Sequence, residues 1–537
     1  MSSKDDKREW ELPHLREAHQ MIGLDNVSAD FWSVKFYPYT EPGVDPVFAV
    51  VGGKRIMVCR PPGGKDNAKI DVIQEILDEE KETDHYACAW SKDAETGIPL
   101  LCVAGGSDQV KVFNAVTGDL LRTFPGHGGE INDLAVSPIN PYIIASASED
   151  CTVRIWSLDP RHAEQPCAAI LEGDGHKETV LCLAFHPTGR YLLSGGIDHR
   201  INLWTLPEFP DANTGTNIPT RIYYPHFSTS EIHGDIVDCV SWYGDLILSK
   251  AANEHNIVLW SITNFNSSSP PPPPSLAPTS HDASRDARSS FVSPPLSAAD
   301  NAITLYTRHL QLSIPESQIM FTRFSLFPGC KTGPGRHPVV AFCNTNSKVF
   351  FWDFERFENY YDTQSSLPGA DCVLVPVSGC RGTSPTKVEK GVNIPTDNTP
   401  RAHPFLHPFQ RRNRGGGNVG GAGAIARLAR ETSLSESTGS EHTNQDDTSQ
   451  GQSQNQAQAA ANTNNAGKGK IDWARSREGW KAKYELGDPI TELEPHHTEM
   501  VKGLKFTGRQ VAWSNDGEWC VVVGSSGSIG VLGRWGR

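Results

Sequence analysis

The chain of 537 residues carries 49 lysines and arginines against 63 aspartates and glutamates, a formal net charge of −14. This acidic balance argues against a fold-wide nucleic-acid surface, because such surfaces gain affinity when basic side chains release counterions from phosphates. No run of 18 apolar residues predicts a membrane span, and the charged start MSSKDDKREWELPHLRE differs from a secretory signal. We therefore expect a soluble intracellular protein that binds no membrane and makes no strong direct contact with nucleic acid.

The chain begins with an expected N-terminal extension, residues 1–25, and continues in short apolar runs separated by Pro, Asn, Gly and Asp turns, the pattern of β-strands. These runs occur at 31–60 and 86–113 and become a clear repeat at 126–156 and 175–204, where each copy starts with Gly-His and ends with Trp. The period is 49 residues between the histidines and 48 between the tryptophans. It is slightly longer than the about 40–45 residues of WD40 repeats.

Three further copies, at 233–260, 319–353 and 495–532, bring the number of repeats to seven. The sequence therefore predicts an all-β fold, a seven-bladed WD40 β-propeller with long disordered insertions. The last copy ends almost at the C-terminus. We therefore expect an N-terminal strand to complete the final blade and close the ring.

Two low-complexity stretches interrupt the repeats. One contains five consecutive prolines at 270–274, and the other includes 431–470, which has no aromatic residue and too little apolar surface to offset its ordering entropy. The Arg411–Arg414 cluster in the second stretch is a nuclear import signal, a local nucleic-acid contact or a solubilising patch. The expected organisation is an extension (1–25), blades 1–5 (26–262), a Pro/Ser-rich insertion (263–300), blade 6 (301–364), a disordered insertion (365–470), and blade 7 with ring closure (471–537).

Histidine, aspartate and tryptophan recur together in the two clear repeats, at His127, Asp150 and Trp156 and again at His176, Asp198 and Trp204. We interpret these groups as structural: with Ser146 or Ser194 they are expected to hydrogen-bond within one blade and fix its strands. Other histidines, among them His496 and His497, show neither metal-ligand spacing nor a nucleophile partner. The twelve cysteines contain no C-x-x-C pair, so we predict no metal site, no cofactor and no disulfide framework.

The innermost strand of each blade starts near one mouth of the central channel. Alignment of these strands places seven residues on that rim: Trp32, Tyr86, Asn132, Leu181, Asp238, Met320 and Arg509. Phe321 lies beside Met320. Aromatic faces carry negative quadrupole potential and exclude water, which suits a methylated ammonium that keeps its charge but loses its hydrogen-bond donors. The rim therefore predicts recognition of trimethyl-lysine in preference to unmodified lysine.

Several motifs of the chain are more specific than general WD signatures. They are Tyr86–Trp90 (YACAW), 225–229 (PHFST), 237–240 (VDCV) and 244–250 (GDLILSK). In these motifs the sequence resembles the EED, or extra sex combs-like, family of Polycomb repressive complex 2 subunits, and the similarity extends over about 26–262, 301–360 and 485–537.

The resemblance implies a nuclear, non-catalytic subunit that binds an Enhancer-of-zeste methyltransferase and a Suppressor-of-zeste partner. It also implies a cage for trimethylated lysine twenty-seven of the histone H3 tail, whose occupancy stimulates the methyltransferase. The cage positions fall on Trp32, Tyr86, Met320 and Phe321. We expect peptide contacts at the channel mouth from Arg509, Asn132 and Asp238.

Met320 departs from the family pattern, which usually has tryptophan at this position, the best cation–π partner. A thioether packs against methyl groups but offers no ring face, so we expect weaker binding of the mark.

Two other functions compete with this interpretation. One is a WD40 scaffold or ubiquitin-ligase adaptor without methyl-lysine recognition, although Arg356 follows Trp352-Asp353 one residue too late for a W-D-x-R docking signature. The other is a propeller hydrolase or metalloenzyme, which needs a titratable cluster at the channel mouth. The rim offers only Asp238 and Arg509 in that role, so we expect no enzymatic activity.

Overall fold

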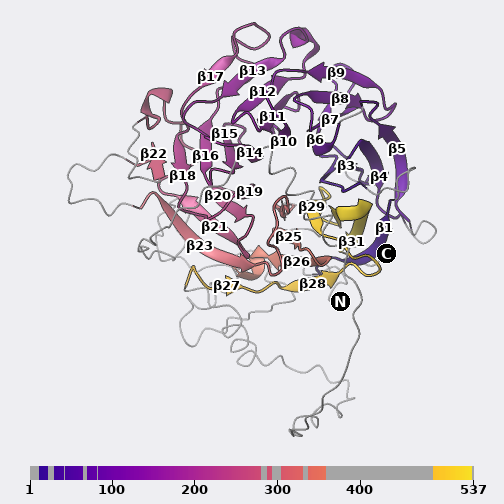
Figure 1. Ribbon diagram of the computed structural model, residues 1–537. Coiled ribbons are helices and arrows are strands. Elements are labelled where there is room, and N and C mark those ends of the chain that lie inside the picture. Colours follow the sequence, from indigo (N-terminus) through magenta and orange to yellow (C-terminus); the bar gives the residue numbers. More distant parts are fainter. Residues whose placement is uncertain are drawn as a thin grey trace, which may run out of the picture.

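Seven small sheets surround a common axis in the computed structural model (Figure 1). The structure describes residues 11–21, 29–41, 43–63, 69–80, 83–279, 287–292, 304–330, 337–357 and 488–534. The predicted insertion 365–470, with its arginine cluster, lies outside these residues. No helix in the described part of the chain has the length and apolar character needed to cross a membrane. The prediction of a seven-bladed propeller is confirmed.

Blades 1 and 2 each consist of four consecutive antiparallel strands. Blade 1 contains β2 (Ser33–Phe36), β3 (Phe48–Gly52), β4 (Arg55–Arg60) and β5 (Asp71–Leu77). Blade 2 contains β6 (His85–Lys92), β7 (Pro99–Gly105), β8 (Val110–Asn114) and β9 (Leu120–Phe124).

Blades 3, 4 and 5 each add a fifth strand at the outer edge. Blade 3 contains β10 (Ile131–Val136), β11 (Ile143–Ser148), β12 (Val153–Ser157), β13 (Cys167–Leu171) and β17 (Thr220–Ile222). Blade 4 contains β14 (Val180–Phe185), β15 (Tyr191–Gly196), β16 (Ile201–Thr205), β18 (Phe227–Thr229) and β22 (Ala287–Ser289). Blade 5 contains β19 (Val237–Tyr243), β20 (Leu246–Ala251), β21 (Asn256–Ile262), β23 (Tyr306–Ser313) and β27 (Glu492–Leu493).

Blades 6 and 7 draw strands from distant parts of the sequence. Blade 6 contains β24 (Ser325–Phe327), β25 (Val339–Cys343), β26 (Lys348–Asp353) and β28 (His497–Met500). Blade 7 contains β29 (Gly508–Trp513), β30 (Trp519–Gly524), β31 (Ser528–Gly533) and β1 (His14–Gln20). Short 3-10 helices lie at η1 (Pro160–His162), η2 (Pro274–Leu276) and η4 (Ser525–Gly527).

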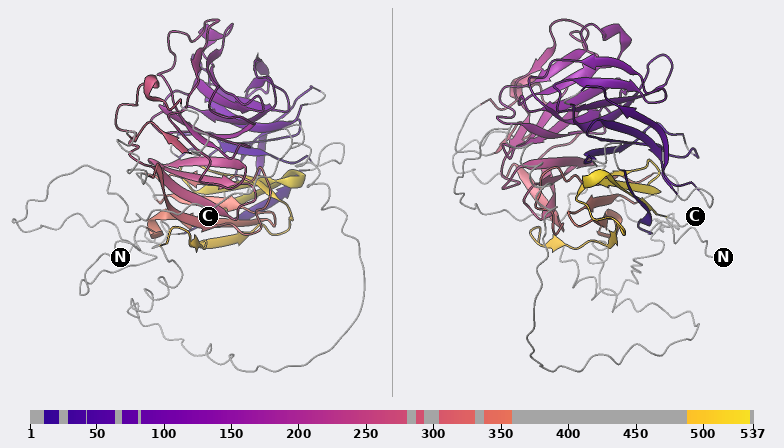
Figure 2. Two further views of the ribbon diagram at one scale, coloured as in Figure 1. Left: turned by 60° about the vertical axis from the view of Figure 1, so that its left-hand side comes forward. Right: turned by 45° about the vertical axis from the view of Figure 1, so that its right-hand side comes forward.

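The ring closes through β1, which pairs antiparallel with β31 along its length. Figure 2 shows this indigo strand beside the yellow C-terminal strands. The predicted closure by an N-terminal strand is confirmed, but the strand lies inside the stretch 1–25 that we expected to be an extension. Ring closure therefore begins at residue 14.

Three other expected boundaries shift because outer strands belong to the preceding blade. Strand β23, expected in blade 6, completes blade 5, and β28, expected in blade 7, completes blade 6. Strand β22 lies inside the expected insertion 263–300 and pairs with β18 of blade 4. The first six predicted repeats correspond to the three inner strands of one blade each, and the outer strands come from later segments of the chain.

The hydrophobic core is divided among the seven contacts between neighbouring blades. The innermost strands touch in cyclic order, with β2 against β6 and against β29. Because each sheet is covered on both faces, strands such as β3 and β30 are buried at every residue. This explains why the sequence shows continuous apolar runs rather than alternation.

A hydrogen-bonded tetrad fixes blades 3, 4 and 5. In blade 3 the Trp156 indole N–H donates to Ser146 Oγ at 2.7 Å, and the Ser146 hydroxyl donates to His127 Nε2 at 2.6 Å. The Nδ1–H of His127 donates to Asp150 at 2.9 Å. Blade 4 repeats these bonds, as predicted. Blade 5 forms a version that the sequence analysis missed, since its acidic member is Glu254.

Candidate functional site

The rim residues singled out in the sequence occupy a common structural position, a β-bulge near the start of the innermost strand. The register shifts once in β6, β10, β14, β19 and β29. The extra residues are Tyr86, Asn132, Leu181, Asp238 and Arg509. A bulge removes one residue from the ladder and re-aims its side chain. In blade 1, Trp32 directly precedes β2 and donates its backbone N–H to Val51.

Three aromatic rings from blades 1, 2 and 6 meet at the rim. The Trp32 ring lies 6.0 Å from that of Tyr86, with the planes at 80°, and 6.0 Å from that of Phe321, with the planes at 77°. All three side chains are partly exposed. The structure thus brings Phe321 beside Trp32 and Tyr86, which precede it by more than 200 positions in the chain. The rings of Tyr86 and Phe321 stand edge-on to the indole. We call Trp32, Tyr86, Met320 and Phe321 the aromatic rim.

Arg509 of blade 7 contacts this cluster at both Trp32 and Met320. Its guanidinium carbon lies 4.4 Å from the centre of the Trp32 ring, a cation–π contact. One terminal nitrogen donates to the Met320 carbonyl oxygen at 3.2 Å and the other donates to Asp30 at 3.3 Å. Only 1% of Arg509 is exposed. Because the Asp30 carboxylate balances its charge, Arg509 holds Trp32 in place without leaving an uncompensated cation beside the aromatic rim.

Phe321 has a backbone conformation that bulky residues rarely adopt, with φ at +58°. The residue before it, Met320, packs with Phe321 against Leu181 and Ile197 of blade 4. Left-handed backbone at a non-glycine residue is strained and persists where the surroundings enforce it, often at binding sites. The turn before β24 therefore directs the Phe321 ring toward Trp32 while Met320 remains partly exposed beside it.

Asn132 and Asp238, expected to contact a peptide, are turned into the ring. Asn132 is 6% exposed and donates to the Val180 carbonyl oxygen at 3.1 Å. Asp238 is fully buried and forms an ion pair with Lys250 at 3.0 Å. Burial raises the pKa of Asp238, against the opposing effect of Lys250. Both side chains are thus engaged within the ring, as is that of Arg509, and the expected contacts of all three with a peptide stay predictions.

Arg323 crosses the central channel, a role that the sequence analysis did not assign. From blade 6 it donates to Asp133 of blade 3 at 2.9 Å and to the carbonyl oxygens of Asn132 and Leu181 at 2.9 and 2.8 Å. Asp133 in turn accepts a bond from the Leu183 backbone N–H. A buried arginine is rare without such partners. Only its position two residues after Phe321 hinted that Arg323 lies beneath the rim.

The aromatic rim suits recognition of a cation rather than chemistry on a substrate. Its walls are aromatic and thioether groups, and the charged side chains of Arg509, which contacts Trp32, and Asp30 pair with each other. Aromatic faces attract ammonium groups by about 0.5–2 kcal/mol each, more when water is excluded. The geometry therefore supports a binding site for a bulky, weakly hydrated ammonium ion.

Comparison with known proteins agrees with the fold. A family model, "WD domain, G-beta repeat", matches residues 118–157 and 166–205. Each match contains the fourth strand of one blade, β9 or β13, and the three inner strands of the next, blade 3 or blade 4. The chain is 41% identical to the Polycomb protein EED of Chaetomium thermophilum over 99% of this chain and 97% of that protein. It is 28% identical to the Polycomb protein esc of Drosophila melanogaster over 62% of this chain and 71% of the relative.

Solved structures give the same relationship. A chain in the crystal structure of the Chaetomium thermophilum polycomb repressive complex 2 superposes with a TM-score of 0.72 and 37% identity, covering 98% of this chain and 99% of that one. A chain from the structure of the same complex with H3K27me3 and H3K27M superposes with a TM-score of 0.73 and 37% identity, covering 99% of each.

Proposed function

The chain belongs to the EED family of Polycomb proteins, and from this premise we propose that it is a nuclear, non-catalytic subunit of Polycomb repressive complex 2 that binds trimethylated lysine through its aromatic rim. The single observation that carries the reader function is the meeting of Trp32, Tyr86 and Phe321 at one rim, with two rings edge-on to the third. A related chain has been seen in a complex that also holds H3K27me3.

The preference for a trimethylated lysine follows from solvation. An unmodified ammonium loses three strong hydrogen bonds to water on entering an aromatic site, whereas a trimethylated one has no donors to lose and keeps its charge. The aromatic rim offers ring faces, and the carboxylate of the neighbouring Asp30 pairs with Arg509. It therefore favours the methylated form.

The scaffold function is the second part of the proposal. We propose that the propeller holds an Enhancer-of-zeste-type methyltransferase, together with a Suppressor-of-zeste-type subunit. Occupancy of the aromatic rim would stimulate the enzyme if the active arrangement binds the trimethylated peptide more tightly than the resting one. Purification of the tagged chain from its own cells should recover the methyltransferase; recovery of a cullin adaptor instead would favour the adaptor function.

The reader function is tested with histone H3 tail peptides, trimethylated or unmodified at lysine twenty-seven, in calorimetric titrations of the full chain. Tyr86→Ala should weaken binding of the trimethylated peptide by about 5- to 30-fold, because one ring contributes about 1–2 kcal/mol. Tyr86→Phe, the matched control, keeps the ring and should bind nearly as well as the wild type. Equal weak binding of both peptides by all three proteins would remove the reader function and leave the scaffold function standing.

A further inference from the structure

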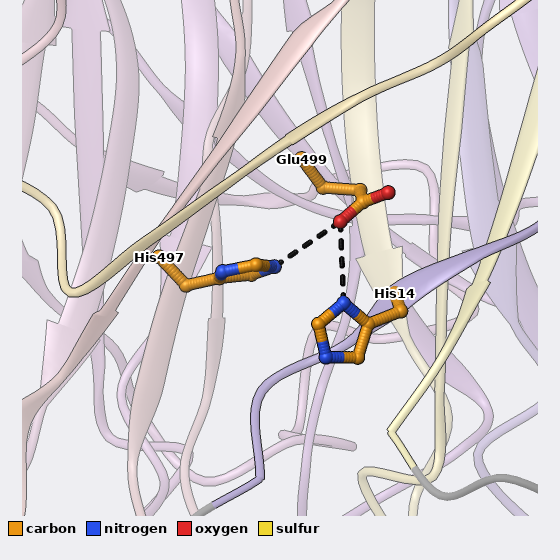
Figure 3. A group of neighbouring side chains, drawn as sticks. All are labelled: His14, His497 and Glu499. Atoms are coloured by element: carbon orange, nitrogen blue, oxygen red, sulfur yellow. Dashed lines mark hydrogen bonds and ion pairs between the residues drawn. The ribbon is translucent and has the colours of Figure 1, made fainter. Parts of the chain in front are cut away.

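Two histidines and a glutamate converge where strand β1 of blade 7 meets strand β28 of blade 6. His14 Nδ1 lies 3.2 Å from Glu499 Oε2, and His497 Nε2 lies 3.3 Å from the same oxygen. Figure 3 shows both imidazoles pointing at the carboxylate, His14 from the indigo strand β1 and the other two from the yellow strand β28. One nitrogen or oxygen from each residue lies within 4.8 Å of the other two.

These spacings suit a metal ion of the size of Zn²⁺. Zinc binds imidazole nitrogen and carboxylate oxygen at about 2.0–2.1 Å with tetrahedral geometry, which places neighbouring ligand atoms about 3.3 Å apart. Two of the three ligand pairs already have this separation. Two imidazoles and one carboxylate form a donor set that zinc takes in proteins, with water as the fourth ligand. The side chain of His14 is 49% exposed, which leaves room for that water.

The surrounding residues hold the three ligands in place. The His497 ring stacks on Phe351 at 5.9 Å and meets the His14 ring edge-on at 4.7 Å. Nε2 of His497 is buried and, among the described residues, makes no hydrogen bond of good geometry, although the Glu499 oxygen lies close. His497 and Glu499 share one face of β28 because residues two apart on a strand point the same way. In the neutral imidazole that carries its proton on Nδ1, Nε2 has the lone pair that a metal ligand requires.

We propose that His14, His497 and Glu499 bind a Zn²⁺ ion that fastens the N-terminal strand β1 to blade 6. The three ligands come from two strands that lie far apart in the chain, since 485 residues separate His14 from Glu499. Among the described strands β1 pairs only with β31, so its other side is the outer edge of the blade 7 sheet. A metal ion between β1 and β28 secures this edge. It is a structural site and has no part in recognition at the aromatic rim.

Zinc titration of the untagged full chain, freed of metal by a chelator, tests this proposal. We expect one Zn²⁺ per chain that raises the thermal midpoint and protects β1 from proteolysis, since a ligand that binds only the folded form stabilises it. His14→Gln and His497→Gln should each weaken this binding by at least about tenfold and abolish the protection. His19→Gln, on the same strand but outside the cluster, is the matched control and should behave as the wild type.

Glu499→Gln separates metal binding from folding, because it keeps the shape of the side chain and removes the ligand charge. Its metal-free thermal midpoint should stay near that of the wild type while zinc no longer raises it. The proposal is overturned if the His14→Gln/His497→Gln double variant, folded by circular dichroism, binds as much zinc as the wild type with the same affinity. It is equally overturned if zinc leaves β1 as sensitive to protease as before.

Discussion

Blades 3, 4 and 5 carry a serine at an interior position where blades 7, 1 and 2 carry a valine. In the first group this residue of the second strand, which pairs with the innermost strand, is Ser146, Ser194 or Ser249. In the second group the same position holds Val522, Val50 or Val103, each fully buried. The hydrogen-bonded tetrad stabilises blades 3, 4 and 5, whereas apolar packing takes its place in blades 7, 1 and 2. The aromatic rim lies on blades 1, 2 and 6, outside the three blades that contain the tetrad.

The largest expected effect is the difference in stability between a variant that lacks a structural tryptophan, Trp204, and one that lacks a ligand-binding tryptophan, Trp32. Trp204→Ala in blade 4 should lower the free energy of unfolding by about 3–5 kcal/mol, because it empties a buried position and removes one of the two hydrogen-bond partners of Ser194. Trp32→Ala, at a partly exposed position, should cost about 1 kcal/mol yet abolish binding of the trimethylated peptide. Denaturant unfolding and peptide titration of both variants measure this. Equal losses of stability would contradict the division into two groups.

The tetrad itself is tested by Ser194→Ala. This change leaves the indole N–H of Trp204 and Nε2 of His176 without their shared partner, and should cost about 1–3 kcal/mol in urea unfolding. Val103→Ala at the equivalent position of blade 2 is the matched control, since it removes methyl groups but orphans no polar atom. A Ser194→Ala protein as stable as the wild type would show that the tetrad does not contribute to the stability of the fold.

Met320→Trp should sharpen the function of the aromatic rim. A fourth aromatic face beside Phe321 is expected to strengthen binding of the trimethylated peptide by about fivefold, or about 1 kcal/mol, without changing stability. Fluorescence anisotropy of a labelled histone peptide measures the gain. Met320→Leu, which adds no ring, should bind as the wild type does, and a gain of equal size there would point to packing rather than cation–π attraction.

The smallest expected effect is on pH dependence. Burial lowers the pKa of His127, so the folded protein favours the neutral imidazole. The unfolded histidine, with a pKa of about 6.5, binds protons first as the pH falls, so this contribution to stability is present above that pH and declines below it. The free energy of unfolding should therefore decrease between about pH 7 and pH 5.

The same urea experiments at several pH values test the assignment. His127→Gln should reduce this slope, whereas Ser194→Ala keeps every ionisable group and should retain it. Burial alone would raise the pKa of Asp150, but its bonds with His127, Gly128 and Thr152 outweigh burial and lower it. Asp150 therefore adds a further loss of stability only below about pH 4, where the unfolded carboxyl is protonated. If His127→Gln leaves the pH dependence of the free energy of unfolding unchanged, the tetrad is not the source of that dependence.

The sequence predicted those features that recur in the chain. The repeat revealed the blades, and the alignment of strand starts placed Trp32, Tyr86 and Phe321 together because equivalent positions in a propeller face one channel. Prediction from the sequence failed where the position of a side chain depends on a β-bulge or on contact between the two ends of the chain. The bulge that turns Asn132 and Asp238 inward leaves no mark in apolar periodicity. Likewise, no spacing rule could connect His14 with Glu499.

Pairing of β1 with β31 also sets an order of events during synthesis. The first strand leaves the ribosome about 500 residues before its partner, residues 528–533. At about 5–20 residues per second, that interval lasts roughly 25–100 s. Throughout this interval β1 has no partner strand, so the ring cannot close before residues 528–533 have been synthesised.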